Sequence, residues 1–183
     1  YFDQGVQKEP IDQTLLNQSI DWYNRGIAIT KIDPYDKANL ITNMATSYAA
    51  LGQNEKALTE FANAERLDSN ILEIYLNRSL LYVNAKQYPQ ALVDYDHIVR
   101  MGAANADIYY ERGMCHASMN NQTQAIQDFD AAIRLESTFA NAYLERARSN
   151  AATGRMDEAR KDLQAGLKNG GNPGPELRKQ IGI

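Results

Sequence analysis

Apolar residues return along most of this chain at spacings of three, four and seven positions, which is the spacing of one face of an α-helix. The same residue types also recur every 34 residues. A column of small side chains holds Ala57, Ala91, Ala125 and Ala159. Four positions later, a column of large apolar side chains holds Phe61, Tyr95, Phe129 and Leu163. Columns that share one period predict an array of repeated helix pairs.

A third column, 16 positions before each alanine, opens the other helix of each pair and holds Ile41, Tyr75, Tyr109 and Tyr143. Residues that favour turns lie between the patterns: Gly52 and Gly154 suit a left-handed backbone, and Pro89 suits the first turn of a helix. The pattern predicts helices at about 37–51, 54–67, 71–84, 88–101, 105–119, 122–135, 139–152 and 156–169.

These columns resemble those of the tetratricopeptide repeat family, in which an aromatic, a small residue and a Tyr precede Ala and Phe or Tyr. The similarity is clearest in YLNRSLLYVNAKQYPQALVDYDHIV (75–99) and YYERGMCHASMNNQTQAIQDFDAAIRL (109–135). The motif's final proline is replaced by Ser69, Ser137 and Gly171, and the last repeat diverges most. The resemblance implies an all-α fold: a right-handed α-solenoid of four helix pairs, with an N-terminal helix and a short C-terminal capping helix.

The expected organisation has three parts. Residues 1–35 form a lead-in and a capping or degenerate half-repeat helix, and residues 36–171 form the repeats 36–69, 70–103, 104–137 and 138–171. Residues 172–183 form a short cap, because terminal repeats need an apolar face covered. We expect residues 1–9 to be an extended or disordered lead-in, and residues 176–181 to pack through Leu177 and Ile181.

The N-terminal helix is predicted within residues 11–32, where Leu16, Ile20, Tyr23 and Ile27 recur at helical spacing. We expect Trp22 to be partly buried there. Asp33-Pro34 is similar to the end of a family repeat. Because the chain begins with Tyr1 rather than Met, we expect that a tag, a signal peptide or a longer native sequence was removed upstream.

Composition narrows the function classes. The chain has 19 Lys and Arg against 23 Asp and Glu, a net charge of −4, which argues against nucleic-acid binding. No stretch approaches the ~18 apolar residues of a membrane span, so no direct membrane insertion is predicted. Amides are abundant, with 16 Asn and 12 Gln, and Arg outnumbers Lys 11 to 8. This balance favours an exported protein, in a bacterial periplasm or envelope, over a cytoplasmic one.

Catalytic chemistry is not predicted. The chain has one cysteine, Cys115, and two histidines, His97 and His116. Side chains of the neighbours Cys115 and His116 leave a helix about 100° apart and cannot converge on one metal. We find no phosphate loop, dinucleotide fingerprint or zinc signature. The prediction is therefore a protein that is not an enzyme and has no catalytic residues, metal or cofactor, with Cys115 a small core residue.

Two charged columns are predicted to pair. Arginine recurs at Arg78, Arg112 and Arg146, and aspartate follows 16 positions later at Asp94, Asp128 and Asp162. The first repeat carries Met44 and Glu60 instead. We expect partly buried arginine–aspartate pairs that fix the register of the helices. A role in ligand binding is the alternative.

The resemblance also implies that the first helix of each pair lines a concave groove. Four of the expected groove side chains are acidic and one is basic, around apolar groups. Such a surface suits an extended or helical peptide with basic groups flanking apolar anchors. The alternative is an acidic face that only keeps the array soluble. The candidate residues are Asn43, Glu73, Leu76, Asn77, Leu80, Asp107, Tyr110, Glu111, Met114, Leu144, Glu145 and Arg148, with Asn39, Thr42, Thr46 and Asn141 in the same columns.

One branch of the family binds acidic chaperone tails through a clamp of Lys, Asn and Arg side chains. Only Asn77 fits that clamp here, and Asp107 and Glu111 would repel a carboxylate. The function predicted is a non-catalytic scaffold for protein–protein interaction, a monomer or weak homo-oligomer that binds a protein or peptide with basic and apolar groups. The alternatives are a self-associating assembly module that pairs through its terminal helices, and the regulatory or localising part of a larger protein.

Overall fold

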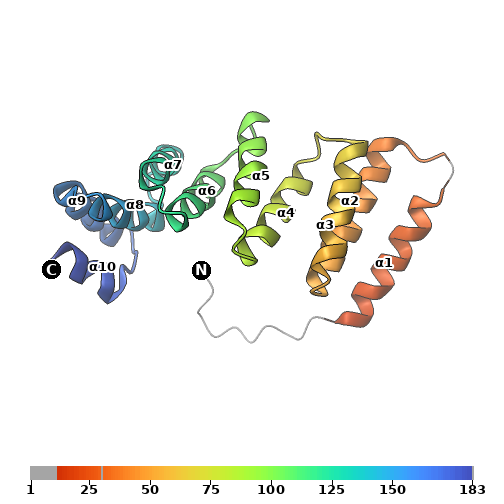
Figure 1. Ribbon diagram of the computed structural model, residues 1–183, viewed down its shortest axis with the longest axis horizontal. Coiled ribbons are helices and arrows are strands. Elements are labelled where there is room, and N and C mark those ends of the chain that lie inside the picture. Colours follow the sequence, from red (N-terminus) through yellow and green to blue (C-terminus); the bar gives the residue numbers. More distant parts are fainter. Residues whose placement is uncertain (1–11, 30, 183) are drawn as a thin grey trace. The chain divides into compact units, whose positions relative to one another are not determined.

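The computed structural model describes residues 12–29 and 31–182, and all regular structure there is α-helical (Figure 1). The predicted lead-in at residues 1–9 lies outside the described residues. The chain divides into two compact units, Tyr1–Leu81 (unit 1) and Tyr82–Ile183 (unit 2). Its helices are α1 Gln13–Ile27, α2 Pro34–Ala50, α3 Asn54–Leu67, α4 Leu72–Asn84, α5 Tyr88–Arg100, α6 Ala106–Ser118, α7 Gln122–Leu135, α8 Ala140–Ala152, α9 Met156–Lys168 and α10 Gly174–Ile181.

For the eight helices predicted between residues 37 and 169, the predicted ends agree with the structure to within one residue, except at the start of α2. This helix begins at Pro34, not near residue 37. The Asp33 carboxylate caps it by accepting a hydrogen bond from the Tyr35 N–H at 2.8 Å, and Pro34 in the first turn has no N–H to leave unpaired. Asp33-Pro34 therefore begins a helix, and the expectation that it ends a repeat was wrong.

The N-terminal helix α1 packs along α2, as predicted. Asp12 caps it by accepting from the backbone N–H groups of Thr14 and Leu15. Its buried residue is Ile20. Trp22, expected to be partly buried, is 68% exposed, because it is turned about 200° around the helix from Ile20. The Arg25 guanidinium lies 5.3 Å from the centroid of the Trp22 ring.

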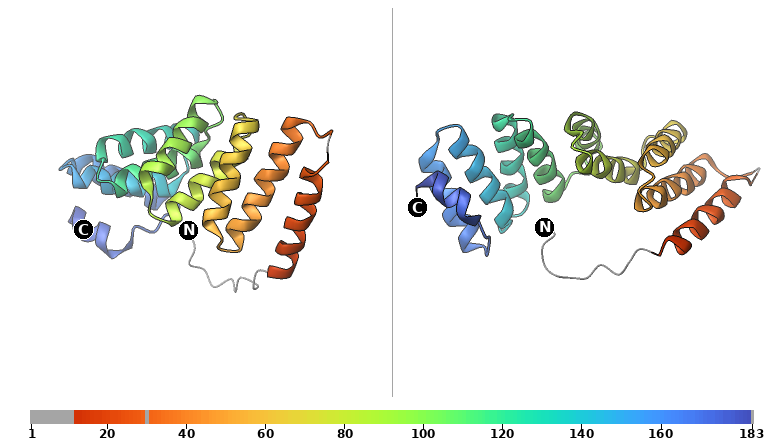
Figure 2. Two further views of the ribbon diagram at one scale, coloured as in Figure 1. Left: turned by 45° about the vertical axis from the view of Figure 1, so that its right-hand side comes forward. Right: turned by 60° about the horizontal axis from the view of Figure 1, so that its bottom comes forward.

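The alanine and aromatic columns form the core of both units. All four alanines are fully buried, and Phe61, Tyr95, Phe129 and Leu163 are buried beside them. Ala57 and Phe61 lie on α3, which packs closely on α2, while α6 packs on α7 and α8 on α9 (Figure 2). A methyl-sized side chain allows two helices this close approach, and the large residue one turn later fills the remaining groove.

The C-terminal helix α10 covers the end of unit 2. Leu177 is fully buried and Ile181 nearly so, and both belong to the cluster that holds Leu144, Ala159 and Leu163. The prediction of a short capping helix that packs through Leu177 and Ile181 is confirmed. No helix in the described part of the chain is long and apolar enough to cross a bilayer.

The turn inside each helix pair uses one left-handed residue at the same place in the period. Gly52 and Gly154 have φ of 74° and 79°, as their sequence positions predicted. Lys86 and Asn120 take the same conformation with φ of 57° and 61°. Because a side chain disfavours this conformation, these two turns carry backbone strain that glycine avoids.

Candidate protein-binding site

The candidate groove residues divide between the two units, five in unit 1 and seven in unit 2, and each set is described by itself. In unit 2 they lie on α6 and α8, the first helices of their pairs, which touch each other. The name "α6–α8 face" is used below for the candidate residues of α6 and α8 that are not buried: Asp107, Tyr110, Glu111, Met114, Glu145 and Arg148.

Tyr110 is the aromatic centre of the α6–α8 face. Its half-buried ring lies 5.0 Å from that of Phe139 and 5.9 Å from that of Phe129, both tilted. Met114, one turn further along α6, is also half-buried. Ring contacts of this kind hold Tyr110 in place, so that its remaining surface is a rigid apolar anchor.

The negative charge of this face comes chiefly from α6. Burial raises the pKa of the Glu111 carboxyl above its ordinary value of 4.5, and the charge of Asp107, one turn away and exposed, raises it further. On α8, Glu145 accepts a hydrogen bond from Arg148 at 3.2 Å. Because that pair is neutral overall, Asp107 and Glu111 supply the net charge of the face.

Leu144 does not belong to the accessible part of the groove. It is 4% exposed and packs in the cluster with Leu163, Leu177 and Ile181. The side chain faces inward and packs against Gly166 of α9 and Gly171 in the turn that follows. Leu144 is therefore unavailable to a partner in this structure.

In unit 1 the candidates lie on α2 and α4. The Asn77 amide donates to the Thr46 hydroxyl at 3.1 Å and so joins the two helices. Asn43, Glu73 and Leu80 are exposed, and Leu76 and Asn77 are half-buried. Thr42, from the same columns, is only 2% exposed and donates to the Ala38 carbonyl within its helix, so it is unavailable to a partner.

The predicted arginine–aspartate pairs are present in both repeats that lie wholly within unit 2. Arg112 donates to both oxygens of Asp128, at 2.9 and 2.6 Å, and also to Asp96 on α5 at 2.9 Å. The Asp128 hydrogen bond, with the nearby acidic charges, raises the pKa of Arg112. Arg146 repeats the arrangement with Asp162 and with Asp130 on α7. Each arginine therefore joins its own helix pair to the preceding one.

The second aspartate of each arginine was missed from the sequence, although Asp96 and Asp130 are themselves 34 residues apart. A further regular contact places each guanidinium 5.5 Å from the centroid of the tyrosine three positions earlier, Tyr109 for Arg112 and Tyr143 for Arg146. In unit 1, Arg78 binds Glu65 at 2.7 Å.

Cys115 and His116 have the environment of core residues. Cys115 is buried, and burial raises the pKa of its thiol to about 12, which makes it a poor nucleophile. The Nδ1 atom of His116 is buried without a hydrogen-bond partner, and burial lowers the pKa of its imidazole. Within the described ranges, no group of three or more His, Cys, Asp and Glu side chains could hold a metal ion.

The comparisons with known proteins decide the family. The model of the tetratricopeptide repeat matches residues 76–138 and 110–173, which together span more than half of the chain. The chain belongs to the tetratricopeptide repeat family. It is an all-α solenoid of these repeats, which are generally non-catalytic modules that bind proteins or peptides. No curated protein sequence is detectably similar to it.

Several solved tetratricopeptide repeat structures share the fold. YrrB, described as having an unusual peptide-binding site, superposes with a TM-score of 0.75 at 22% identity over 89% of this chain and 81% of its own. MamA superposes with a TM-score of 0.74 at 19% identity, over 84% of this chain and 88% of its own. A tetratricopeptide repeat protein from Parabacteroides merdae ATCC 43184 superposes with a TM-score of 0.77 at 21% identity, over 94% of this chain and 69% of its own. At these identities the likeness concerns the fold alone.

Proposed function

We propose that this chain is a scaffold that binds a peptide segment on the first helices of its repeats, and that the α6–α8 face makes the principal contact in unit 2. The segment carries apolar anchors flanked by lysine or arginine. The observation that supports this most directly is Tyr110, a half-buried ring braced by Phe129 and Phe139, beside the net negative pair Asp107 and Glu111.

The physical basis is pre-organisation. Helix packing and the arginine pairs hold the face in one shape, so binding does not have to order it. A peptide's apolar side chain gains by covering Tyr110 and Met114, and its cations gain by lying near Asp107 and Glu111. The exposed positions Asn43, Glu73 and Leu80 of unit 1 offer a second polar and apolar surface.

The test is a selection from displayed random peptides on the purified chain, followed by affinity measurement of the selected peptides. We expect basic and apolar residues to be enriched. Asp107→Lys with Glu111→Lys should weaken binding at least tenfold, while the control pair Glu55→Lys with Glu176→Lys makes the same change in net charge away from the face. Asp107 and both control residues lie in first turns, so the controls match the loss of a favourable charge at a helix N-terminus, whereas Glu111 lies in the middle of α6. Enrichment of acidic peptides, or equal binding by the two variants, would contradict the proposal.

Self-association is a second candidate, supported by the outer surface of α1. Leu15 and Trp22 on α1 and Ile29 just beyond it recur every seven positions and are each at least 59% exposed. Such a stripe suits pairing with the same stripe of another copy. Sedimentation across a concentration series tests it: a dimer that Trp22→Gln disrupts supports this function, and a strict monomer at all concentrations excludes it.

A further inference from the structure

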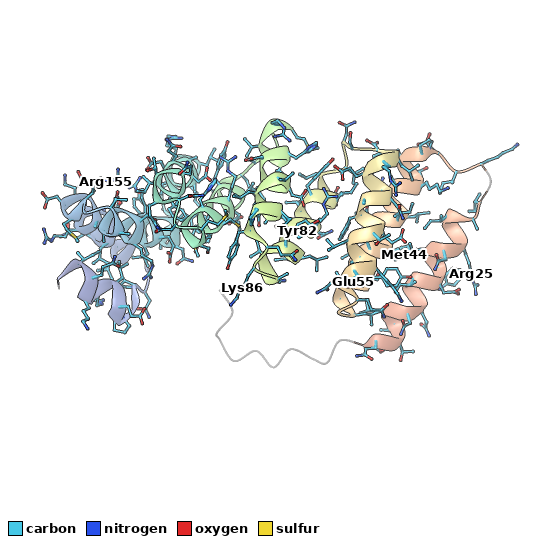
Figure 3. All side chains as sticks on the ribbon, viewed as in Figure 1. Arg25, Met44, Glu55, Tyr82, Lys86 and Arg155 are labelled. Carbon is cyan, nitrogen blue, oxygen red and sulfur yellow. The ribbon has the colours of Figure 1, made fainter. Side chains whose placement is uncertain are left out.

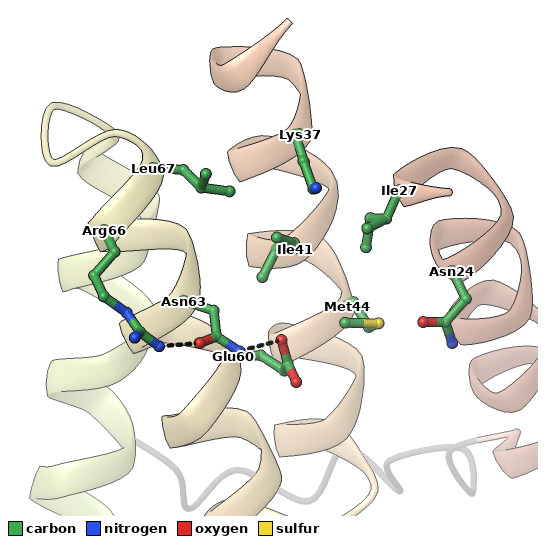
Figure 4. Close-up of a pocket in the computed structure, with 9 residues that line it drawn as sticks. All are labelled: Asn24, Ile27, Lys37, Ile41, Met44, Glu60, Asn63, Arg66 and Leu67. Atoms are coloured by element: carbon green, nitrogen blue, oxygen red, sulfur yellow. Dashed lines mark hydrogen bonds between the residues drawn. The ribbon is translucent and has the colours of Figure 1, made fainter. Parts of the chain in front are cut away.

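Unit 1 contains an open cleft of about 560 Å³ between α1, α2 and α3, on different residues from those of the candidate groove (Figures 3 and 4). Its base is apolar, and Glu60 supplies its one carboxylate. This "first-repeat cleft" is lined by Asn24, Ile27, Lys37, Ile41, Met44, Glu60, Asn63, Arg66 and Leu67.

The last repeat has a cleft of about 400 Å³ whose lining includes Ile126, Arg146 and Asp162, three periods after Asn24, Met44 and Glu60 of the first-repeat cleft. At the wall of this cleft, Arg146 binds both Asp162 and Asp130. Met44 and Glu60 lie three 34-residue periods before Arg146 and Asp162. The first repeat therefore has a carboxylate in the aspartate column but a methionine in the arginine column.

The Glu60 carboxylate has a single hydrogen-bond donor in the described part of the chain, the Asn63 amide at 3.0 Å. The amide oxygen of Asn63 in turn accepts from Arg66. Figure 4 shows Glu60 turned toward Met44 of α2. A carboxylate accepts up to four hydrogen bonds, so Glu60 keeps acceptor positions for an incoming cation.

The two cations that line the cleft, Arg66 and Lys37, do not occupy these acceptor positions of Glu60. Arg66 donates to Asn63 and to the Ala62 carbonyl rather than to Glu60. Lys37 lies on α2 two helical turns, roughly 10 Å, from Met44. Met44 is buried, with 5% of its surface exposed, and has the unbranched shape of an arginine stem without its charge. Ile41 and Ile27 extend the apolar base beside it.

We propose that the first-repeat cleft binds an arginine side chain of a protein partner. The methylene stem lies over Met44, Ile41 and Ile27, and the guanidinium donates to Glu60. The partner thus supplies from outside the charge that Arg112 and Arg146 supply within unit 2. This contact is independent of the α6–α8 face, and the two can fail separately.

The test uses the full chain with labelled methionine methyl groups and N-acetylarginine amide as the probe. We expect the NMR signal of Met44 to shift on titration and that of Met114, on the α6–α8 face, to stay. The uncharged isostere N-acetylcitrulline amide should bind at least tenfold more weakly. Tighter binding of free L-arginine would indicate an amino-acid site and overturn the proposal, as would an unshifted Met44 signal or equal binding of the citrulline probe.

Two substitutions separate the contact from general effects. Glu60→Gln should lower the affinity for the probe at least tenfold. Glu55 is an exposed carboxylate on the same helix, and Glu55→Gln should leave that affinity unchanged. Met44→Arg should abolish binding, since the chain's own arginine would then occupy Glu60. Binding that survives Glu60→Gln overturns the proposal even if Met44→Arg fails to fold. Asp107→Lys with Glu111→Lys, which tests the α6–α8 face, should leave the Met44 shift unchanged.

Discussion

Replacing Arg112 with Met tests whether paired charges hold the helices of unit 2 together. The first repeat already carries Met44 in this column, so methionine has a shape that the fold accommodates. In the variant, the Asp128 carboxylate loses the guanidinium that donates to both of its oxygens. Asp128 is only 4% exposed, so water cannot replace that partner without local opening.

The expected magnitude follows from the burial of the two aspartates. Removing one partner of a buried ion pair costs about 3–5 kcal/mol, because the other charge stays buried. The Asp96 side chain is 51% exposed, and exposed pairs contribute about 0.2–1 kcal/mol. Because the Arg112 side chain is itself partly exposed, we expect Arg112→Met to lower the free energy of unfolding by about 3 kcal/mol, the lower end of that range. Most of this loss comes from the unpaired Asp128 carboxylate.

The assay is urea unfolding followed by circular dichroism, with an unchanged slope as the condition for comparing midpoints. Asp96→Asn is the control and should cost less than about 1 kcal/mol. Adding Asp128→Leu to Arg112→Met should recover most of the loss, since it removes the unpaired charge. The reasoning is refuted if Arg112→Met costs no more than Asp96→Asn, or if the double variant is no more stable than the single one.

Three further predictions concern single positions. Lys86→Gly should raise the free energy of unfolding by about 1 kcal/mol in urea unfolding, because Lys86 has φ of 57°, whereas Lys56→Gly inside α3 should lower it. Gly113→Ala should cost about 1–3 kcal/mol in the same assay, because its Cβ would lie 2.7 Å from the buried Phe129 ring; an unchanged midpoint would contradict the close packing. The lowered pKa of His116 means that the unfolded chain binds its proton more readily, so stability falls as the pH drops below the ordinary histidine value of 6.5. His116→Asn, which copies the Asn150–Asp162 hydrogen bond, should reduce this pH dependence of the melting temperature, and an identical pH profile would exclude His116 as its source.

The helix pairs could be predicted because each column has one packing role throughout the array. Ala125 and Phe129, for example, are fully buried, as their column requires. A small residue followed one turn later by a large one has the same physical meaning in every repeat, so the signal is counted four times. The arginine pairs could be predicted for the same reason.

Most of the predictions that failed depend on contacts between helices, which the residue pattern within one helix does not contain. The α1 sequence has two apolar stripes, one through Ile20 and one through Trp22, and only the neighbour α2 decides which is buried. Leu144 occupies a groove column, yet α10 brings Leu177 against its cluster. Asp33 was a missed local signal, because aspartate before proline is itself a helix-start pattern.

The most direct test of the account is the methionine methyl NMR spectrum of the full chain titrated with a selected peptide. If the α6–α8 face is the binding site, the Met114 signal shifts in proportion to binding, while that of Met156 on α9 stays in place. Asp107→Lys with Glu111→Lys should abolish the Met114 shift. A peptide that binds tightly and leaves Met114 unmoved would contradict the central claim that the first helices of the repeats bind the partner.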